Sequence, residues 1–409
     1  MSNANNKYAL ANIAIFLYFL FFNPLFAVTL TAITNIFYKR INKVVFFFSF
    51  CLAWALSYFI RDFTIHAGDI VGYLEWYHYS QFRSFQEIIY SFFHAPIQNE
   101  LFWHLYNKLF SIFFGYSPFL YVLITYAFIF FLIASLGYLI NNLYFPVIIF
   151  FILLLNLGVL YNVFYVWRHS IASLLFLIGV YHNKIIISRI FIYSATLFHL
   201  VAVPLIIIYE VFLYLKGSKH FIRYTKLFSQ STFFYCLLFL LGAMAFEVLV
   251  TELSIIFNLH SFSNNTYEEG INFRYQWLFI PLSLLLMFSL WSSRAFIHKT
   301  DLFFGLNYYL FVFISLLIQN IPSIIWGRAF YVLLFGVTIV VAKYILLQKK
   351  STIIIIIIIV ACYRFYTMLS PEISLEFKSI AGGDFNSPFS GVLYLLYNYD
   401  YYNMYKVLQ

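Results

Sequence analysis

Long apolar runs constrain the fold of this chain more than any other feature of its sequence. They are about 17–25 residues long and are separated by short polar loops, which is the pattern of helices that cross a bilayer. Of the 409 residues, 64% are hydrophobic and only 10% are charged, too few polar side chains to cover a soluble domain. The sequence therefore predicts an all-α, polytopic integral membrane protein with about 11–13 transmembrane helices.

We interpret residues 1–409 as a single membrane domain with three polar segments on its outer side. The first apolar run lacks a small-residue cleavage site and continues into further apolar sequence, so we expect it to remain as a helix. The outer segments are a large loop with an amphipathic helix (61–117), a second loop (251–273) and a C-terminal tail (370–409).

The distribution of charge predicts which ends of the helices face the cytoplasm. A net charge of +9 can indicate nucleic-acid binding, but here the basic residues gather in loops such as the one holding Lys39, Arg40 and Lys43. This is the bias expected of cytoplasmic loops in membrane proteins, so we expect no nucleic-acid partner. Most acidic residues fall on the opposite side, together with a set of basic residues at the outer face: Arg61, Arg168, His199, Arg274 and Arg328.

Two apolar segments do not fit a single straight span. Residues 8–38 form either one long tilted helix or two short helices hinged at Asn23-Pro24, and the sequence leaves both readings open. Residues 185–215 are too long for one span at about 1.5 Å per residue, so we expect two helices that meet near His199. The other expected spans are 44–60, 118–140, 144–164, 170–181, 231–250, 275–293, 302–318, 329–347 and 352–369.

Residues 101–114 form the amphipathic element of the first outer loop. Their apolar positions recur at helical spacing, but His104, Asn107 and Lys108 interrupt the apolar face. A segment this short with this polar content favours an interfacial or re-entrant helix over a span.

The stretch 161–204 carries ionisable residues at two expected membrane boundaries. Arg168-His169 lies at the start of one helix and Phe198-His199 at the end of the next. Ionisable groups beside hydrocarbon are costly and mark functional sites by default. Because the predicted layout puts both boundaries at the outer face, we expect Arg168 and His199 to lie close together.

Arginines at the outer face predict a site for phosphate. The guanidinium binds phosphate through two parallel hydrogen bonds and keeps its charge when partly buried. We therefore expect Arg61, Arg168, Arg274 and Arg328 to hold a pyrophosphate. The alternative is that they extend to the interface or pair with acids such as Asp62.

Candidate proton-transfer and sugar-binding groups lie on the same side. Asp69, between Gly68 and Gly72, is either a general base or a helix cap, and His199 is either a base, acid or phosphate donor or a packing residue. Tyr73, Tyr77 and Tyr79 can stack on sugar rings or belong to an interfacial aromatic belt. We expect Tyr73, His169 and Tyr331 to contact sugar.

Motifs for cofactor chemistry are absent from the sequence. It contains no Walker loop, no Asp-x-Asp pair, no HExxH and no nucleophile elbow. The cysteines show no metal or CxxC spacing. We therefore expect no cofactor and no metal, as for an enzyme whose donor is an activated lipid-linked sugar.

Several short motifs resemble those of EpsG-like and Wzy-type polysaccharide polymerases. The spacing Arg61…Gly68-Asp69…Tyr73 resembles their outer-loop motif of an arginine, G-D and tyrosine. The run Asn162…Arg168-His169…Ala172 is similar to their N-x-x-R-Q-x-x-A helix start, with histidine in place of glutamine.

Two later elements extend the resemblance over residues 10–345. Phe198-His199 resembles the family's F-H-x-S element, with Val201 in place of serine, and Arg328-Ala-Phe-Tyr331 resembles its late R-x-x-x-Y/F element with one residue fewer before the tyrosine. The resemblance implies a metal-independent glycosyltransferase of the bacterial inner membrane that works on the periplasmic side. Its substrate would be an undecaprenyl-pyrophosphate-linked oligosaccharide, polymerised onto the non-reducing end of another repeat unit. Membrane lipids, a chain-length regulator and a flippase would be its partners.

The same resemblance implies roles for the outer residues. Arg168, Arg328 and Arg61 would hold the leaving pyrophosphate, and Asp69 or His199 would take the proton of the acceptor hydroxyl. Two alternatives share the outer arginines: another lipid-linked glycosyltransferase, such as an O-antigen ligase, and a flippase or transporter of lipid-linked sugars. A transporter is less favoured because its charges usually lie at mid-membrane within internal repeats, and no repeat is visible.

Overall fold

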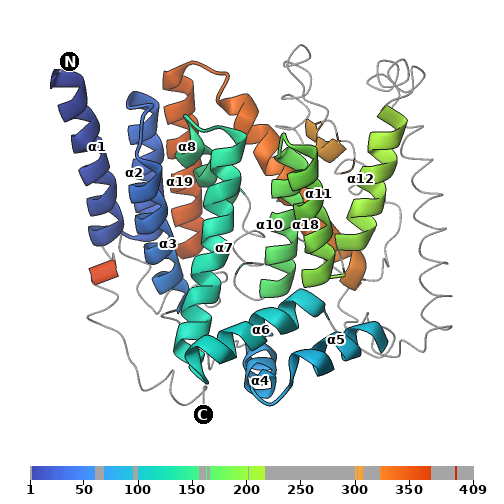
Figure 1. Ribbon diagram of the computed structural model, residues 1–409. Coiled ribbons are helices and arrows are strands. Elements are labelled where there is room, and N and C mark those ends of the chain that lie inside the picture. Colours follow the sequence, from blue (N-terminus) through green and yellow to red (C-terminus); the bar gives the residue numbers. More distant parts are fainter. Residues whose placement is uncertain are drawn as a thin grey trace. The chain divides into compact units, whose positions relative to one another are not determined.

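The described part of the chain is helical throughout in a computed structural model (Figure 1). The structure describes residues 2–59, 69–94, 100–155, 163, 166–200, 202–216, 300–301, 303–305, 307, 323–369 and 392–393. These residues confirm the all-α class. They fall into two compact units, Met1–Ala202 with Ala342–Gln409, and Val203–Val341.

The first unit contains a bundle of long helices. Its members are α1 (Ser2–Phe21), α2 (Pro24–Phe37), α3 (Lys43–Phe59), α7 (Pro118–Ile140), α8 (Phe145–Leu154), α10 (Trp167–Tyr181), α11 (Ile185–Phe198) and α19 (Lys350–Leu369). α3 packs against α7, α7 packs against α10, and α10 packs against α11, while α2 lies between α8 and α19. Over most of their length, the inward faces of these helices carry no charged residue. Aromatic side chains fill the interior between them.

The N-terminal apolar run is two helices. α1 ends at Phe21 and α2 begins at Pro24. The Asn23 side chain accepts a hydrogen bond from the Leu25 backbone N–H at 2.9 Å, and proline occupies the first helical position, where its missing N–H costs nothing. This local chemistry decides between the two readings that the sequence left open.

Three shorter helices form a layer at one end of this bundle. They are α4 (Ile70–Ser80), α5 (Phe85–His94) and α6 (Leu101–Phe114), and they run across the ends of α7, α10 and α11 in Figure 1. α6 packs against α4, α5 and α11. The helix expected over 101–114 is confirmed with the same bounds, so this loop carries helical structure over much of its length.

The turn from this layer into α7 depends on one glycine. Gly115 has a φ of 61°, a left-handed conformation that glycine adopts without the strain of a Cβ. The Tyr77 hydroxyl donates to the Gly115 carbonyl and accepts from the Ser117 N–H at 2.9 Å. The tyrosine thus ties α4 to the start of α7.

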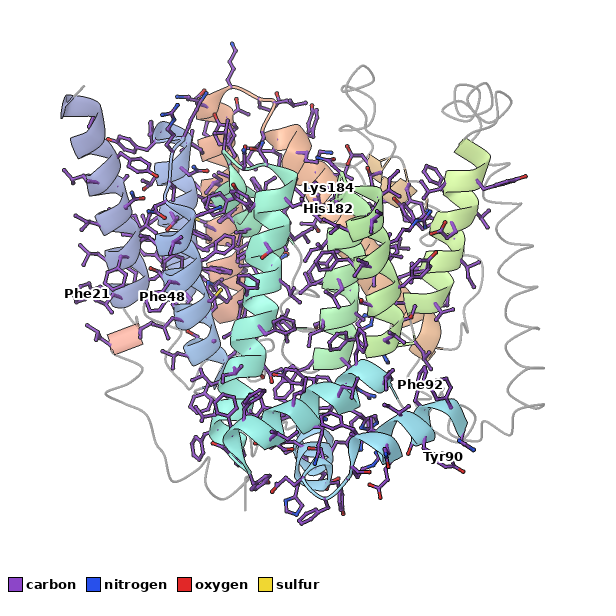
Figure 2. All side chains as sticks on the ribbon, in the orientation of Figure 1. Phe21, Phe48, Tyr90, Phe92, His182 and Lys184 are labelled. Carbon is purple, nitrogen blue, oxygen red and sulfur yellow. The ribbon has the colours of Figure 1, made fainter. Side chains whose placement is uncertain are left out.

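The hairpin of α10 and α11 brings its two helices very close together. A Cβ on Gly179 would lie 2.8 Å from the Ser188 carbonyl oxygen, and the Ser188 hydroxyl donates to the Gly179 carbonyl at 2.6 Å. The turn at His182 and Lys184 lies at the end of the hairpin that is remote from α5 (Figure 2). Tyr90 and Phe92, which are labelled in the same figure, show where α5 lies. α11 ends at Phe198, which confirms the break expected near His199.

The second unit contains most of α12 (Ala202–Lys216) and α18 (Ser323–Ile345). Within it, the Phe303 ring contacts the rings of Tyr209 and Phe212 at centroid distances of 5.2 and 5.3 Å. α12 matches the second half of the long run 185–215, as predicted.

One of the described helices, α7, is long and apolar enough to cross a membrane. Other described helices have shorter apolar segments of 10–17 residues. The expected spans 231–250 and 275–293, the loop 251–273, most of 302–318 and most of the tail 370–409 lie outside the described residues. The expected span 144–164 begins as α8, and its second half also lies almost entirely outside them.

Candidate functional site

Glu100 lies at the centre of a buried group of charged side chains in the first unit. Its Oε2 accepts from Arg168 Nη1 at 2.5 Å, and its Oε1 accepts from Nδ1 of His199. The Glu100 side chain is only 6% exposed. Arg168 and His199 therefore lie together as expected, and we call the three residues the Glu100 cluster.

Three elements position the cluster. Glu100 directly precedes α6, Arg168 is in the first turn of α10, and His199 follows the last residue of α11. The hairpin brings the start of α10 and the end of α11 to one end of the bundle, and α6 lies across that end (Figure 1). The break after Phe198 turns the His199 backbone to an extended conformation (φ −160°, ψ 126°), which places its ring beside the carboxylate.

Aromatic rings cover the Arg168 guanidinium. Its carbon lies 4.4 Å from the centre of the Trp76 ring and 5.4 Å from the centre of the Tyr73 ring. Such cation–π contacts hold the planar group without neutralising it. The buried Nε–H of Arg168 has no hydrogen-bond partner within the part of the chain that the structure describes. A buried donor without an acceptor is costly.

The hydrogen bond to Glu100 sets the tautomer of His199. A carboxylate oxygen can only accept, so Nδ1 carries the hydrogen and a neutral imidazole has its lone pair on Nε2. The ring also lies edge-on to His169, with 5.7 Å between centroids. A histidine oriented by a carboxylate in this way can take up a proton, because the carboxylate stabilises the resulting imidazolium.

The carboxylate of Glu100 stays ionised in this setting. Burial acts to raise its pKa, but the hydrogen bonds from His199 and Arg168 and the positive charge of Arg168 outweigh burial and lower the pKa from its ordinary value. Nearby, burial and then the charge of Arg83 lower the pKa of His104 to about 4. At neutral pH the cluster therefore has an anionic glutamate, and the adjacent His104 is uncharged.

Other expected site residues lie around the cluster in different environments. Asp69 is exposed at the start of α4 and makes no capping bond, but its Oδ2 accepts from the Tyr73 hydroxyl at 3.4 Å. Tyr73 is 1% exposed and stacks on Trp167 with 5.2 Å between centroids. Tyr77 is fully buried, and His169 is 2% exposed.

The burial of Tyr73 and His169 does not fit direct stacking on a sugar. The Tyr73 ring contacts Trp103 on one side and Trp167 on another, so no open face remains for a ligand. These side chains instead hold Arg168 and His199 in place.

The remaining arginines cannot be placed beside the cluster. Arg61 and Arg274 lie outside the described residues. Arg328 and Tyr331 belong to α18 in the second unit, and the structure describes only their backbone. Their expected contacts with pyrophosphate and sugar remain predictions.

Sequence reasoning assigned no role to Glu100, the residue that joins Arg168 to His199. The available signal was its position, an acidic residue immediately before the amphipathic segment 101–114 in the same outer loop. An acid expected beside outer-face arginines and a histidine is a candidate partner for them.

Comparisons with models of known protein families, with curated proteins and with solved structures found no match for this chain.

Proposed function

We propose that this chain is a polysaccharide polymerase of the bacterial inner membrane. It transfers a glycan from undecaprenyl pyrophosphate onto the non-reducing end of another lipid-linked repeat unit, at a site that faces the periplasm. The proposal is supported by the resemblance of the motifs around Asp69, Arg168 and His199 to those of Wzy-type and EpsG-like polymerases. Membrane lipids, a chain-length regulator and a flippase are the partners that this function implies.

The apolar surface supports a multi-pass membrane location. Large apolar side chains point outward from the bundle helices of the first unit, among them Phe48 at 61% exposure and Ile185 at 77% (Phe48 is labelled in Figure 2). Water would make such a surface prone to association, whereas lipid chains solvate it. A sequence that is 64% hydrophobic is consistent with this environment.

The observation that carries the proposed chemistry is the Arg168 guanidinium, which pairs with Glu100 through Nη1 while its side chain stays 18% exposed. A guanidinium offers several N–H donors in one plane, so one edge can hold Glu100 while another binds a phosphate oxygen. The cation stays in place because Glu100 and the rings of Tyr73 and Trp76 fix it before substrate arrives.

In the proposed transfer reaction, the cluster residues have separate roles. Nε2 of His199 takes the proton of the acceptor hydroxyl, and Glu100 stabilises the imidazolium that forms. The hydroxyl oxygen bonds to the anomeric carbon of the donor sugar as the bond from that carbon to the pyrophosphate oxygen breaks. Both electrons of that bond leave with undecaprenyl pyrophosphate, whose developing charge Arg168 stabilises. His199 suits the base better than Asp69, which reaches the cluster only through the Tyr73 hydroxyl.

A polymerisation assay tests the proposal. Purified protein in nanodiscs is given the cell's own undecaprenyl-pyrophosphate repeat unit without ATP or added metal, and products are separated on a gel. We expect a ladder from the wild type, a rate about 10²–10³-fold lower for Arg168→Ala, and a loss of about 10²–10⁴-fold for His199→Ala. Arg40→Ala, which removes an exposed arginine, is the matched control and keeps the wild-type rate.

Two results would overturn this function. Movement of the same lipid across liposome membranes without polymer formation would make the chain a flippase. Transfer of the glycan to lipid A core, with no extension of the repeat unit, would make it a ligase.

A further inference from the structure

An open cleft of about 650 Å³ lies among α4, α5 and α6, next to the Glu100 cluster. Its aromatic lining consists of Trp76, Tyr79 and Phe82. The volume falls within the range of about 300–1,000 Å³ that is typical of small-molecule sites. We call it the α4–α6 cleft.

The aromatic side of the cleft presents open ring surfaces. Tyr79 is 62% exposed and Phe82 is 76% exposed, in contrast to the buried Tyr73 on the same stretch of chain. A pyranose ring has an apolar face of C–H groups, and that face packs on an exposed aromatic ring as other apolar groups do. A sugar has an apolar face and polar hydroxyl groups, so exposed rings beside polar side chains match both of its surfaces.

The polar side of the cleft is already ordered. Nη2 of Arg83 donates to the Ser91 hydroxyl at 2.5 Å. At the start of α5, Glu87 Oε2 accepts from the Ser84 N–H at 2.7 Å while the Glu87 N–H donates to the Ser84 hydroxyl at 3.2 Å. This reciprocal capping box fixes the first turn of the helix that carries Ser91. Groups held in place before binding lose less entropy when they engage the hydroxyls of a ligand.

The cleft is continuous with the Glu100 cluster through shared residues. Trp76 lines the cleft and also covers the Arg168 guanidinium, with 4.4 Å to the ring centre. His104 lines the cleft as well, and its ring lies 5.7 Å from that of Trp76. With its pKa lowered to about 4, His104 is neutral at pH 7 and can both donate to and accept from sugar hydroxyls. A ligand in the cleft would therefore lie beside the group that we assign to the leaving pyrophosphate.

We propose that the α4–α6 cleft is a saccharide subsite, in which Tyr79 and Phe82 stack on a pyranose unit while Arg83 and His104 hydrogen-bond to its hydroxyls. The assignment of this sugar to the lipid-linked repeat unit rests on the proposed function. Binding of a free saccharide to the cleft can be measured whether or not the proposed function is correct.

The test measures binding rather than turnover. The repeat unit is released from the cell's own undecaprenyl-pyrophosphate lipid by mild acid, and its affinity for the full chain in nanodiscs is measured by titration calorimetry and saturation-transfer NMR. We expect Tyr79→Ala with Phe82→Ala to weaken binding by about tenfold or more, because two ring contacts are lost. Both side chains are largely exposed, so the protein keeps its fold.

The matched control removes a tyrosine and a phenylalanine of similar exposure outside the cleft. Tyr90 is 64% exposed and Phe93 is 74% exposed, and both belong to α5 (Tyr90 is labelled in Figure 2). Tyr90→Ala with Phe93→Ala should leave the affinity unchanged. Equal affinity in the cleft variant and the wild type, or equal weakening in both double variants, would overturn the subsite.

The outcomes separate this inference from the proposed function. If the protein forms polymer but the cleft variant binds the saccharide with wild-type affinity, the proposed function stands and the proposed subsite is wrong. If saccharide binding depends on Tyr79 and Phe82 but the protein forms no polymer, the subsite stands and the proposed polymerase function is wrong. If both hold, the cleft variant should show a raised KM for the repeat unit at an unchanged kcat.

Discussion

The α3–α7 contact and the Glu100 cluster are both buried in the same unit, but they are built from opposite kinds of side chain. In the contact, which we call the aromatic interface, the Phe130 ring lies 5.8 Å from Phe50, 5.4 Å from Trp54 and 5.1 Å from Tyr58 between centroids. The Glu100 cluster instead buries a carboxylate between a guanidinium and an imidazole.

The two regions stabilise the protein in different ways. Close packing of rings in the aromatic interface gains many dispersion contacts and leaves no charge without water. Burying the charges of the Glu100 cluster costs desolvation, and apolar residues of similar volume would often serve stability as well or better. Packing therefore accounts for the aromatic interface, whereas stability alone does not account for the Glu100 cluster.

The largest expected effect comes from removing the carboxylate. Glu100→Ala leaves Arg168 buried without its anion and His199 without its orienting partner, so we expect stability to fall by about 3–5 kcal/mol. Polymerisation should be lost as well. Unfolding in detergent and the gel assay measure the two effects on the same preparation.

A double substitution separates the two effects. Glu100→Leu with Arg168→Met replaces the ion pair by apolar side chains of similar volume, which should recover most of the stability while activity stays absent. An inactive Glu100→Ala protein of wild-type stability would contradict our account of the pair.

The aromatic interface should respond in stability alone. Phe130→Ala removes a fully buried ring, and we expect a loss of about 3–5 kcal/mol. The rate per folded molecule should stay at the wild-type value, because no cluster residue contacts Phe130 through its ring. A large fall in kcat at a temperature where the variant is folded would show that the two regions are coupled.

A smaller effect is expected in the hairpin that carries Arg168 and His199. In Gly179→Ala, the new Cβ would lie 2.6 Å from Ile192 Cγ1 and 2.8 Å from the Ser188 carbonyl oxygen, so α11 must shift. We expect a loss of about 1–3 kcal/mol and a parallel fall in the polymerisation rate. Gly72→Ala is the control: no atom lies within 4 Å of its Cβ, and alanine is the better helix former. Equal losses of stability in Gly179→Ala and Gly72→Ala would contradict the close approach of α10 and α11.

A further prediction concerns pH. Burial and Arg83 lower the pKa of His104 from 6.5 to about 4, so the unfolded chain binds a proton that the folded chain rejects between these values. The stability linked to this histidine is present above pH 6.5 and is lost as the pH falls toward 4. The pKa of Glu100 is lowered too, so its contribution is present above the ordinary pKa of a glutamate and is lost as the pH falls through the folded-state pKa.

Thermal unfolding between pH 7 and pH 4 tests this window. His104→Gln should flatten the loss of stability, whereas His94→Gln, at an exposed position of α5, should leave the slope unchanged. An unchanged slope in His104→Gln would show that His104 is not the titrating group.

Much of the helical layout could be predicted from local sequence. The bounds of residues 101–114 and 118–140 follow from runs of apolar residues that end at Gly115 and Asn141, and the structure has the same bounds. The length of the run 185–215 and the position of Pro204 within it were enough to place a break near His199. These features depend on neighbours in the chain, so composition and spacing determine them.

The Glu100 cluster depends on contacts that no local pattern encodes. Glu100 lies 68 residues from Arg168 and 99 residues from His199, and α6 has to lie across the end of the hairpin before these side chains can meet. The same packing buries Tyr73 and leaves Tyr79 open, although both tyrosines lie in α4. Local sequence was therefore enough for most of the long helices of the first unit and for the two ionisable ends of the hairpin, but not for α4 and α5. The acid that joins them and the rings that stay exposed depend on the tertiary structure, because burial and long-range pairing are properties of the packed chain.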